Sequence, residues 1–216
     1  MKVTQTTLFT LLILLSLPAQ ALKREYISAS HRGVVARDLS GNPYAPVKVC
    51  WGWSCKKSQE VPLTTEQWDE VASNFLPQAA TPQEERVQIR HAIALMEQLT
   101  GEITGTSADL GAPNSKGVGL PGQMDCVDES TNTSNYLRYF EAQGLLTWHR
   151  FSHIQMRFNM RFNPFAGQHF TAVVFDKKKR RKYAIDSWWD DNGVLPIVQR
   201  LSSWKSRRSF SRRRTP

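Results

Sequence analysis

The sequence lacks an apolar run long enough to cross a membrane comfortably. The run from Leu8 to Leu17 is short, with Lys2 before it and the small-residue triplet Ala19 to Ala21 after it. This pattern is typical of a secretory signal peptide. We therefore expect residues 1–21 to be cleaved and the mature chain to begin at Leu22, in a bacterial periplasm or outside the cell. An uncleaved membrane anchor is the alternative.

Cysteine is also scarce, with three in 216 residues, and none follows the expected cleavage site, which argues against a lipid anchor there. Cys50 and Cys55 flank the sequence Trp-Gly-Trp-Ser, a spacing that suits a disulfide across a turn in an oxidising compartment. Their pairing would leave Cys126 as a lone thiol, and a lone thiol in an exported protein is a candidate for reactivity. The alternative is a bridge from Cys126 to Cys50 or Cys55.

Acidic residues are absent from the end of the chain, residues 202–216, which holds six basic residues. Six more form the run Lys177 to Lys182. Without these twelve and Lys2, 15 basic residues remain against 19 acidic ones, so the basicity is local. No known nucleic-acid motif accompanies it, and we expect no nucleic-acid partner. The predicted partners are a peptide or protein amide substrate and an anionic envelope component bound electrostatically by the two basic stretches.

There are no internal repeats, and 40% apolar content over this length predicts one domain, residues 22–201, followed by a basic, disordered tail, residues 202–216. Turn and capping signals divide the domain into elements. We expect a disulfide-closed hairpin over 47–63, helices over 64–75, 81–101 and 126–142, a strand or irregular segment over 145–158, a turn at 163–167, and strands over 169–175 and 183–189. The predicted fold class is α+β. Residues 101–122 form a long connection that leads to Cys126.

Cys126 lies where loop-forming residues give way to a helical pattern. A thiol at a helix N-terminus gains stabilisation of its thiolate from the helix dipole and the free backbone N–H groups. His169 opens an apolar strand, and Asp186 lies on the next one. In an antiparallel hairpin whose tip is centred near residue 179, residue 172 faces 186, which leaves His169 about three residues from Asp186; a tip nearer 177 or 178, or a bulge, would bring the two together.

The order Cys, His, Asp, with Asp125-Cys126 heading a helix, His169-Phe170-Thr171-Ala172-Val173-Val174 on one strand and Tyr183-Ala184-Ile185-Asp186-Ser187 on the next, resembles the transglutaminase-like branch of the papain-like cysteine hydrolase superfamily. The segment also looks like a group of exported bacterial proteins of uncharacterised function. The resemblance covers about residues 121–193. It implies a helix carrying the cysteine packed on a small antiparallel sheet, with Cys126 as nucleophile, His169 as general base and acid, Asp186 as its orienting residue and Gln123 as oxyanion donor. The family commonly has small or aromatic residues around the thiol, whereas the acidic residues Asp125, Asp128 and Glu129 flank Cys126 here. Their carboxylates oppose thiolate formation unless they pair with bases or point away from the thiol.

Three function classes follow, the third being a small periplasmic structural protein in which Cys126 is merely buried. The first is an exported amide hydrolase or acyl transferase that works through a thioester and needs no cofactor. The second is a non-catalytic binding protein on the same scaffold, which would use its tryptophan-rich loop (Trp51 and Trp53) and its basic edges. His149 and His153 have the spacing of zinc ligands, but arginines surround them, and we expect no metal site there.

Overall fold

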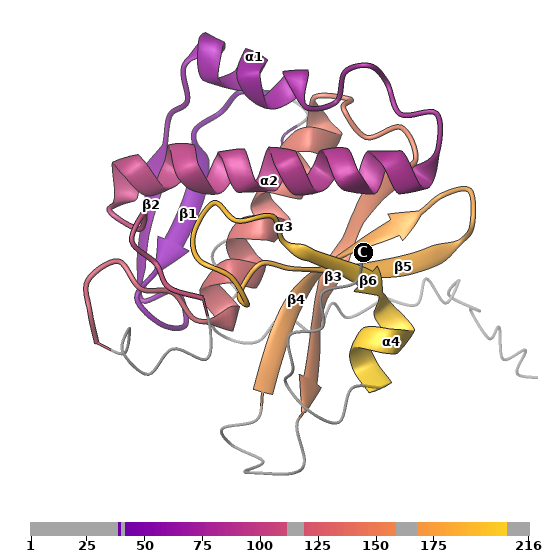
Figure 1. Ribbon diagram of the computed structural model, residues 1–216. Helices are drawn as coiled ribbons and strands as arrows, with labels where there is room; N and C mark the ends of the chain where they lie inside the picture. The colour runs from indigo at the N-terminus through magenta and orange to yellow at the C-terminus, as the bar shows by residue number, and fades with distance from the viewer. Residues whose placement is uncertain (1–38, 40–41, 112–118, 159–167, 207–216) are drawn as a thin grey trace, which may run out of the picture.

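The computed structural model describes residue 39 and residues 42–111, 119–158 and 168–206. The expected signal peptide, the turn at 163–167 and residues 207–216 of the basic tail lie outside these residues. The architecture is α+β, with a two-stranded sheet, a four-stranded sheet and four helices among the described residues (Figure 1). No helix in the described ranges combines the length and apolar character needed to cross a bilayer.

The chain first forms an antiparallel hairpin from β1 (Val47–Trp51) and β2 (Lys57–Val61). Val47 and Val49 alternate toward the core and are fully or almost fully buried, as the strand period requires. A disulfide joins Cys50 and Cys55 and closes the loop between the strands. The predicted clip is therefore confirmed, and Cys126 is a free cysteine.

Two helices follow, each with the N-terminal signal that its sequence contains. Thr64 caps α1 (Thr65–Ser73) in a reciprocal capping box with Gln67, and Thr81 caps α2 (Pro82–Thr104). The predicted end of the second helix at Gly101 is wrong, because α2 continues to Thr104 and ends with Gly105 in the left-handed conformation. A Cβ at Gly101 would lie 3.2 Å from the backbone nitrogen of Ser107. Gly101 therefore serves close packing inside the helix.

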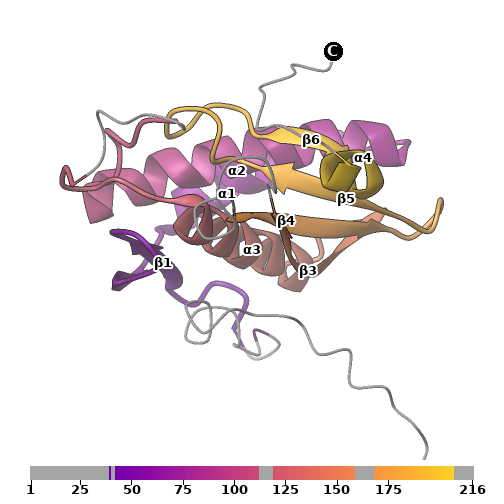
Figure 2. The ribbon, with the colours of Figure 1, turned by 90° about the horizontal axis from the view of Figure 1, so that it is seen from below.

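Helix α3 (Cys126–Ala142) matches its predicted bounds and lies between the β1–β2 hairpin and the strands β3 and β4 (Figure 2). Its first ten residues are all buried although most are polar. Asn132, Thr133 and Ser134 are among them, because the helix is covered on opposite sides by the two sheets. Their polar groups bond to neighbouring backbone and side chains instead of to water.

The larger sheet is an antiparallel meander with the order β3 (His149–Phe158), β4 (Gln168–Asp176), β5 (Arg181–Asp186) and β6 (Ile197–Arg200). The short helix α4 (Leu201–Ser206) follows β6 directly. Most of this helix falls in the segment that the sequence assigned to the tail. Trp204 explains the difference, because it is completely buried and packs with Val173 and Ala184 on the face of the sheet opposite α3.

Candidate active site

Cys126 is the first residue of α3, with Asp125 as the helix cap. The Asp125 carboxylate accepts hydrogen bonds from the backbone N–H groups of Val127 and Asp128. The Cys126 side chain is directed to the edge of β4, where its sulfur lies 3.9 Å from the carbonyl oxygen of Gln168. Because β5 pairs with β4 only as far as Ala172, the first residues of β4, which include Gln168 and His169, extend beyond the end of β5. The thiol thus lies against the strand that carries His169.

The environment keeps the Cys126 thiol protonated. Burial raises its pKa strongly, and the negative charges of Asp125 and Asp186 raise it further, while a hydrogen bond from the backbone of Phe170 lowers it. The exposed fraction of Cys126 is 8%. The helix N-terminus expected to favour the thiolate is outweighed by burial and the two carboxylates, so any thiolate must be formed with the help of a base.

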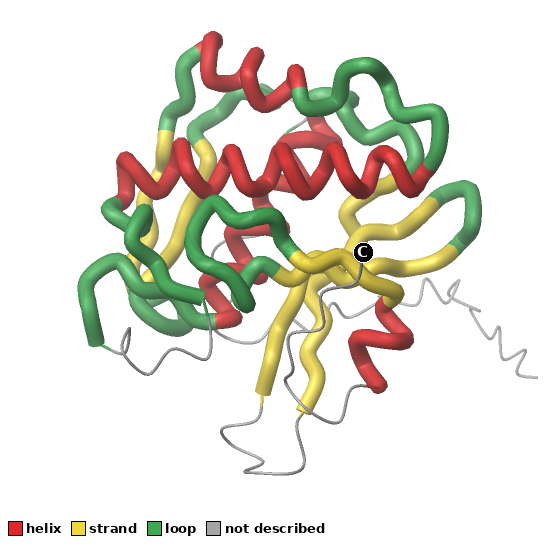
Figure 3. The backbone as a smooth tube through the Cα atoms, in the orientation of Figure 1, coloured by secondary structure: helices red, strands yellow, loops and turns green. Residues whose placement is uncertain are grey.

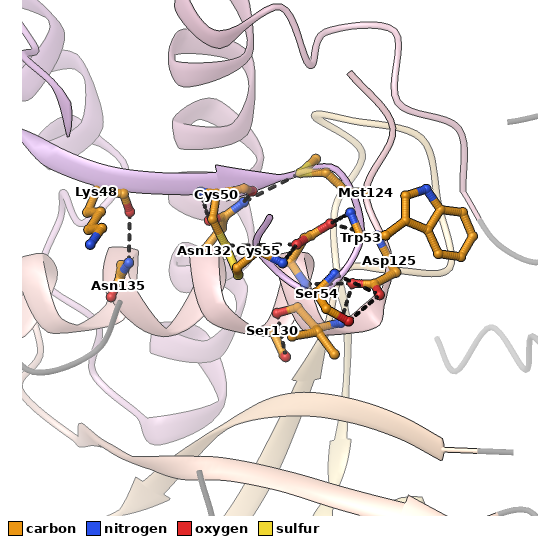
Figure 4. The surroundings of a disulfide bond; sticks show 12 residues. Lys48, Cys50, Trp53, Ser54, Cys55, Met124, Asp125, Ser130, Asn132 and Asn135 are labelled. Atoms are coloured by element: carbon orange, nitrogen blue, oxygen red, sulfur yellow. Dashed lines mark hydrogen bonds between the residues drawn. A yellow bond between two sulfur atoms is a disulfide. The ribbon is translucent and has the colours of Figure 1, made fainter. Parts of the chain in front are cut away.

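The disulfide loop donates backbone hydrogen bonds to two of the acidic residues that neighbour Cys126 (Figure 4). Asp128 accepts hydrogen bonds from the backbone N–H groups of Trp53 and Cys55, and Asp125 accepts one from Ser54. Trp53, Ser54 and Cys55 all have positive φ angles, between 54° and 71°, and this turn directs their N–H groups at the carboxylates. The loop therefore holds the first turn of α3 in place. Figure 4 shows the Trp53 indole pointing outward, and 39% of that residue is exposed.

His169 and Asp186 form a buried, hydrogen-bonded pair. The register of Ala172 with Ile185 places Thr171 opposite Asp186, so His169 is a diagonal neighbour of Asp186 on the same face of the sheet. The His169 Nε2 to Asp186 Oδ2 distance is 2.7 Å. Burial raises the pKa of Asp186, but its attraction to His169 and hydrogen bonds outweigh burial and hold the pKa below its usual value. Nε2 therefore donates to an ionised carboxylate.

Tryptophan side chains surround this pair. Trp189 and Trp204 donate their indole N–H groups to Asp186 Oδ2 at 3.0 and 2.8 Å. The ring of Trp188 lies 4.7 Å from that of His169, measured between centroids. Trp204 is not among the site residues predicted from the sequence, although its spacing of three residues from Leu201 is the signal of a short amphipathic turn within a basic segment.

The imidazole and the thiol approach β4 from different sides. His169 shares a face of the strand with Val173, on the α4 side, whereas Cys126 belongs to the core cluster of Phe170 and Ala172, on the α3 side. The thiol and the imidazole meet this strand at neighbouring positions, since the sulfur contacts the backbone of the residues directly before and after His169.

Gln123, the predicted oxyanion donor, is buried and its side chain holds the preceding loop. Its amide donates to the carbonyl of Ala108 at 2.8 Å and accepts from the N–H of Leu110 at 3.2 Å. These bonds fix the segment that leads into α3. The oxyanion role of Gln123 stays a prediction.

His149 and His153 have different surroundings from those of a zinc pair. The imidazole of His149 is completely buried, with Nδ1 2.7 Å from Glu85 Oε2 and Nε2 3.2 Å from Arg86. This network joins α2 to β3. His153 lies beyond a register shift in β3 and bonds to Ser152 and Gln155. The one set of potential ligands that comes together in the described ranges is Cys50, Cys55 and Asp128, where both sulfurs are bonded to each other and not present as thiolates.

A group of buried carboxyl groups, none of them predicted from the sequence, lies next to the first turns of α3. Ser187 bonds to Glu97 on α2 and donates to Glu129 on α3 at 3.0 Å, and Asp109 in the loop after α2 bonds to Glu129. Burial raises the pKa of Glu97 to about 8 and that of Asp109 to about 7, and it also raises that of Glu129. These groups are neutral in part at neutral pH, which lowers the electrostatic cost of gathering them.

Searches of family models, curated proteins and solved structures returned no match to this chain.

Proposed function

We propose that this protein is an exported cysteine-dependent amide hydrolase or acyl transferase of the transglutaminase-like kind, with Cys126 as nucleophile and His169 and Asp186 as its proton-transfer pair. The observation that supports this most is the 2.7 Å bond between His169 and Asp186 on the strand against which the Cys126 thiol lies. A base needs a third group that fixes its tautomer and orientation, and the buried carboxylate of Asp186 supplies one.

The proposed reaction has two stages. The sulfur of Cys126 attacks an amide carbonyl and forms a carbon–sulfur bond, while His169 takes the thiol proton and then gives it to the departing amine as the carbon–nitrogen bond breaks. Water or a second amine then attacks the thioester, releases the acyl group and restores the thiol. Because Nε2 of His169 is bonded to Asp186, the proton would move through Nδ1.

Burial gives this mechanism a specific feature. The thiol pKa is raised and the residue is nearly enclosed, so the resting protein would hold a neutral thiol and not a preformed thiolate. Proton removal would accompany nucleophilic attack, and the reaction would depend strongly on His169. A general base of this kind contributes about 10²- to 10⁴-fold to rate.

The test is acylation of the purified protein by p-nitrophenyl acetate. We expect a stoichiometric burst of p-nitrophenol and one acetyl group on Cys126, detected by peptide mass spectrometry. The His169→Gln change should slow acylation at least about 100-fold. The matched control is His91→Gln, which changes an exposed histidine on α2 and should leave the rate unchanged. Unfolding curves would show that each variant is folded.

The burial of the thiol also favours a second candidate, a non-catalytic binding protein on the same scaffold. In that case Cys126 is a core residue, and the exposed Trp53 of the disulfide loop is the candidate contact. This function predicts that folded protein is not acylated at Cys126, or that the rate is the same with and without His169. Either result would overturn the enzymatic proposal.

A further inference from the structure

The chain leaves the larger sheet directly after Asp186, and the loop that joins β5 to β6 is fixed on the helices. The hydroxyl of Ser187 bonds to Thr133 and Glu129 of α3, at 2.8 and 3.0 Å. Figure 3 shows this loop as a green tube that runs beside α2, to which it is also hydrogen-bonded. Trp188 therefore lies on a segment that both helices hold in place.

The attachment of Ser187 is to the face of α3 that carries Cys126. Cys126, Glu129 and Thr133 are spaced by three and four residues, so they follow one another along one side of the helix. Trp188, the residue after Ser187, packs against the core cluster that contains Cys126. Trp188 is thereby held on the side of α3 from which the thiol projects.

The same indole also contacts the imidazole. The ring centroids of Trp188 and His169 are 4.7 Å apart, and those of Trp189 and Trp204 lie 5.4 and 5.6 Å from His169. Trp189 and Trp204 are buried, whereas Trp188 is partly exposed. Of the three indoles that the described residues place around His169, Trp188 is thus the one that reaches the surface. It borders both the imidazole and the core cluster of the thiol, which approach β4 from different sides.

We propose that Trp188 determines the specificity of the site and restricts it to short acyl groups, an inference that rests on the proposed function. The imidazole is completely buried and the thiol almost so. An acyl group held between the sulfur and the imidazole therefore lies against the Trp188 indole, which leaves little room for a chain beyond the carbonyl. One methylene more or less in an apolar pocket changes a rate about 10- to 200-fold, so this wall discriminates strongly by length.

The test compares second-order acylation rates of the purified protein with p-nitrophenyl acetate and p-nitrophenyl hexanoate, which differ only in the length of the acyl chain. We expect the wild type to favour the acetate at least about tenfold, and Trp188→Ala to shift the ratio toward the hexanoate at least about tenfold. Trp188→Leu should shift it less. The ratio is measured because a change in the reactivity of Cys126 or His169 alters both rates alike.

The matched control is Trp148→Ala. Trp148 is also partly buried, but its indole donates to the carbonyl of Ala79. Its own carbonyl accepts from Lys177, just after the end of β4, whereas His169 lies at the start of that strand. Trp148→Ala should therefore keep the wild-type ratio.

The outcomes separate this inference from the proposed function. If neither ester acylates Cys126 of the wild type, both are overturned. Acylation at one rate for both esters, or a ratio that the Trp188 variants leave unchanged, overturns the role of Trp188 alone. An equal shift in Trp148→Ala does the same, because it assigns the effect to a general loss of packing. Trp188→Leu retains an apolar contact with the core and decides the question if Trp188→Ala does not fold.

Discussion

At the scale of single residues, one oxygen atom, Oδ2 of Asp186, accepts hydrogen bonds from three buried side chains: His169, Trp189 and Trp204. They come from β4, from the turn after β5 and from α4. The pKa of Asp186 is held below its usual value despite burial, so its ionised form stabilises the fold. This contribution is present above the unfolded-state pKa and is lost as the pH falls through the folded-state value.

Replacing this carboxylate should be costly. We expect Asp186→Ala to lower the free energy of unfolding by about 3–5 kcal/mol, because it leaves an imidazole and two indole N–H groups buried without their acceptor. The control Asp69→Ala removes an exposed carboxylate from α1 and should change stability by no more than about 0.5 kcal/mol. Midpoints of urea unfolding measure both. Equal effects would contradict the role assigned to Asp186.

At the scale of elements, α3 depends on polar contacts that reach the hairpin. The Asn132 side chain bonds to both the N–H and the C=O of Cys50, each at 2.8 Å. One turn later, Asn135 donates to the carbonyl of Lys48 at 2.7 Å. The side-chain amide of Asn132 thus pairs with β1 as the backbone of a neighbouring strand would. This contact positions the disulfide loop over Asp125 and Asp128.

The loss in free energy of unfolding on replacing each asparagine should follow the number of hydrogen bonds that its side chain makes. We expect Asn132→Ala to cost about 2–4 kcal/mol, because it leaves a buried donor and a buried acceptor unpaired. Asn135→Ala removes a single bond and should cost about 1–2 kcal/mol. Denaturant titration measures both losses. A larger loss for Asn135→Ala than for Asn132→Ala would show that the bonds to Cys50 are not what holds α3 to β1.

At the scale of the whole molecule, acidic groups gather in the interior, whereas the basic run Lys177 to Lys182 lies at the hairpin that joins β4 to β5. The buried carboxylates of Glu97, Asp109, Asp128 and Glu129 all have raised pKa values, chiefly because of burial. For Glu97, Asp109 and Asp128 these values are about 8, 7 and 7. In the folded state these groups keep their protons over a pH range in which the unfolded chain has lost them.

The consequence is a protein that is more stable in mild acid than in mild alkali. A raised carboxyl pKa contributes stability below the unfolded value, near pH 4, that is lost as the pH rises through the folded value. We therefore expect the free energy of unfolding to fall between pH 5 and pH 8, by about 1.4 kcal/mol per pH unit for each proton that only the folded state retains. Urea unfolding at a series of pH values measures this slope.

A pair of variants checks the cause of that slope. Glu97→Gln removes one buried titrating group and should make the pH dependence shallower, whereas Glu102→Gln changes an exposed residue of the same helix and should leave it as in the wild type. Stability that is constant or rises from pH 5 to pH 8 would contradict the prediction.

Several features follow from the sequence because their signals are local. The capping residues Thr81 and Asp125 act within one helical turn. The short spacing of Cys50 and Cys55 brings their sulfurs together across a turn. The face shared by His169 and Asp186 was not fixed in this way, because a tip centred near residue 179 pairs Ala172 with Asp186, whereas the folded hairpin pairs Ala172 with Ile185. The α+β class, the hairpin clip and the start of the cysteine-bearing helix could therefore be predicted, although the catalytic roles of the three site residues remain predictions.

Only the tertiary structure decided what each position is buried against. Gly101 has the signal of a helix end but lies inside α2, where Ser107 and Asn192 pack closely against it and leave room only for a glycine. Trp204 stands in a basic segment yet fills the core beneath β4, and the thiol of Cys126 has a raised pKa although it begins a helix. These outcomes depend on burial and charge contributed by residues distant in sequence. Such contacts form only when the chain is folded, so no local pattern records them.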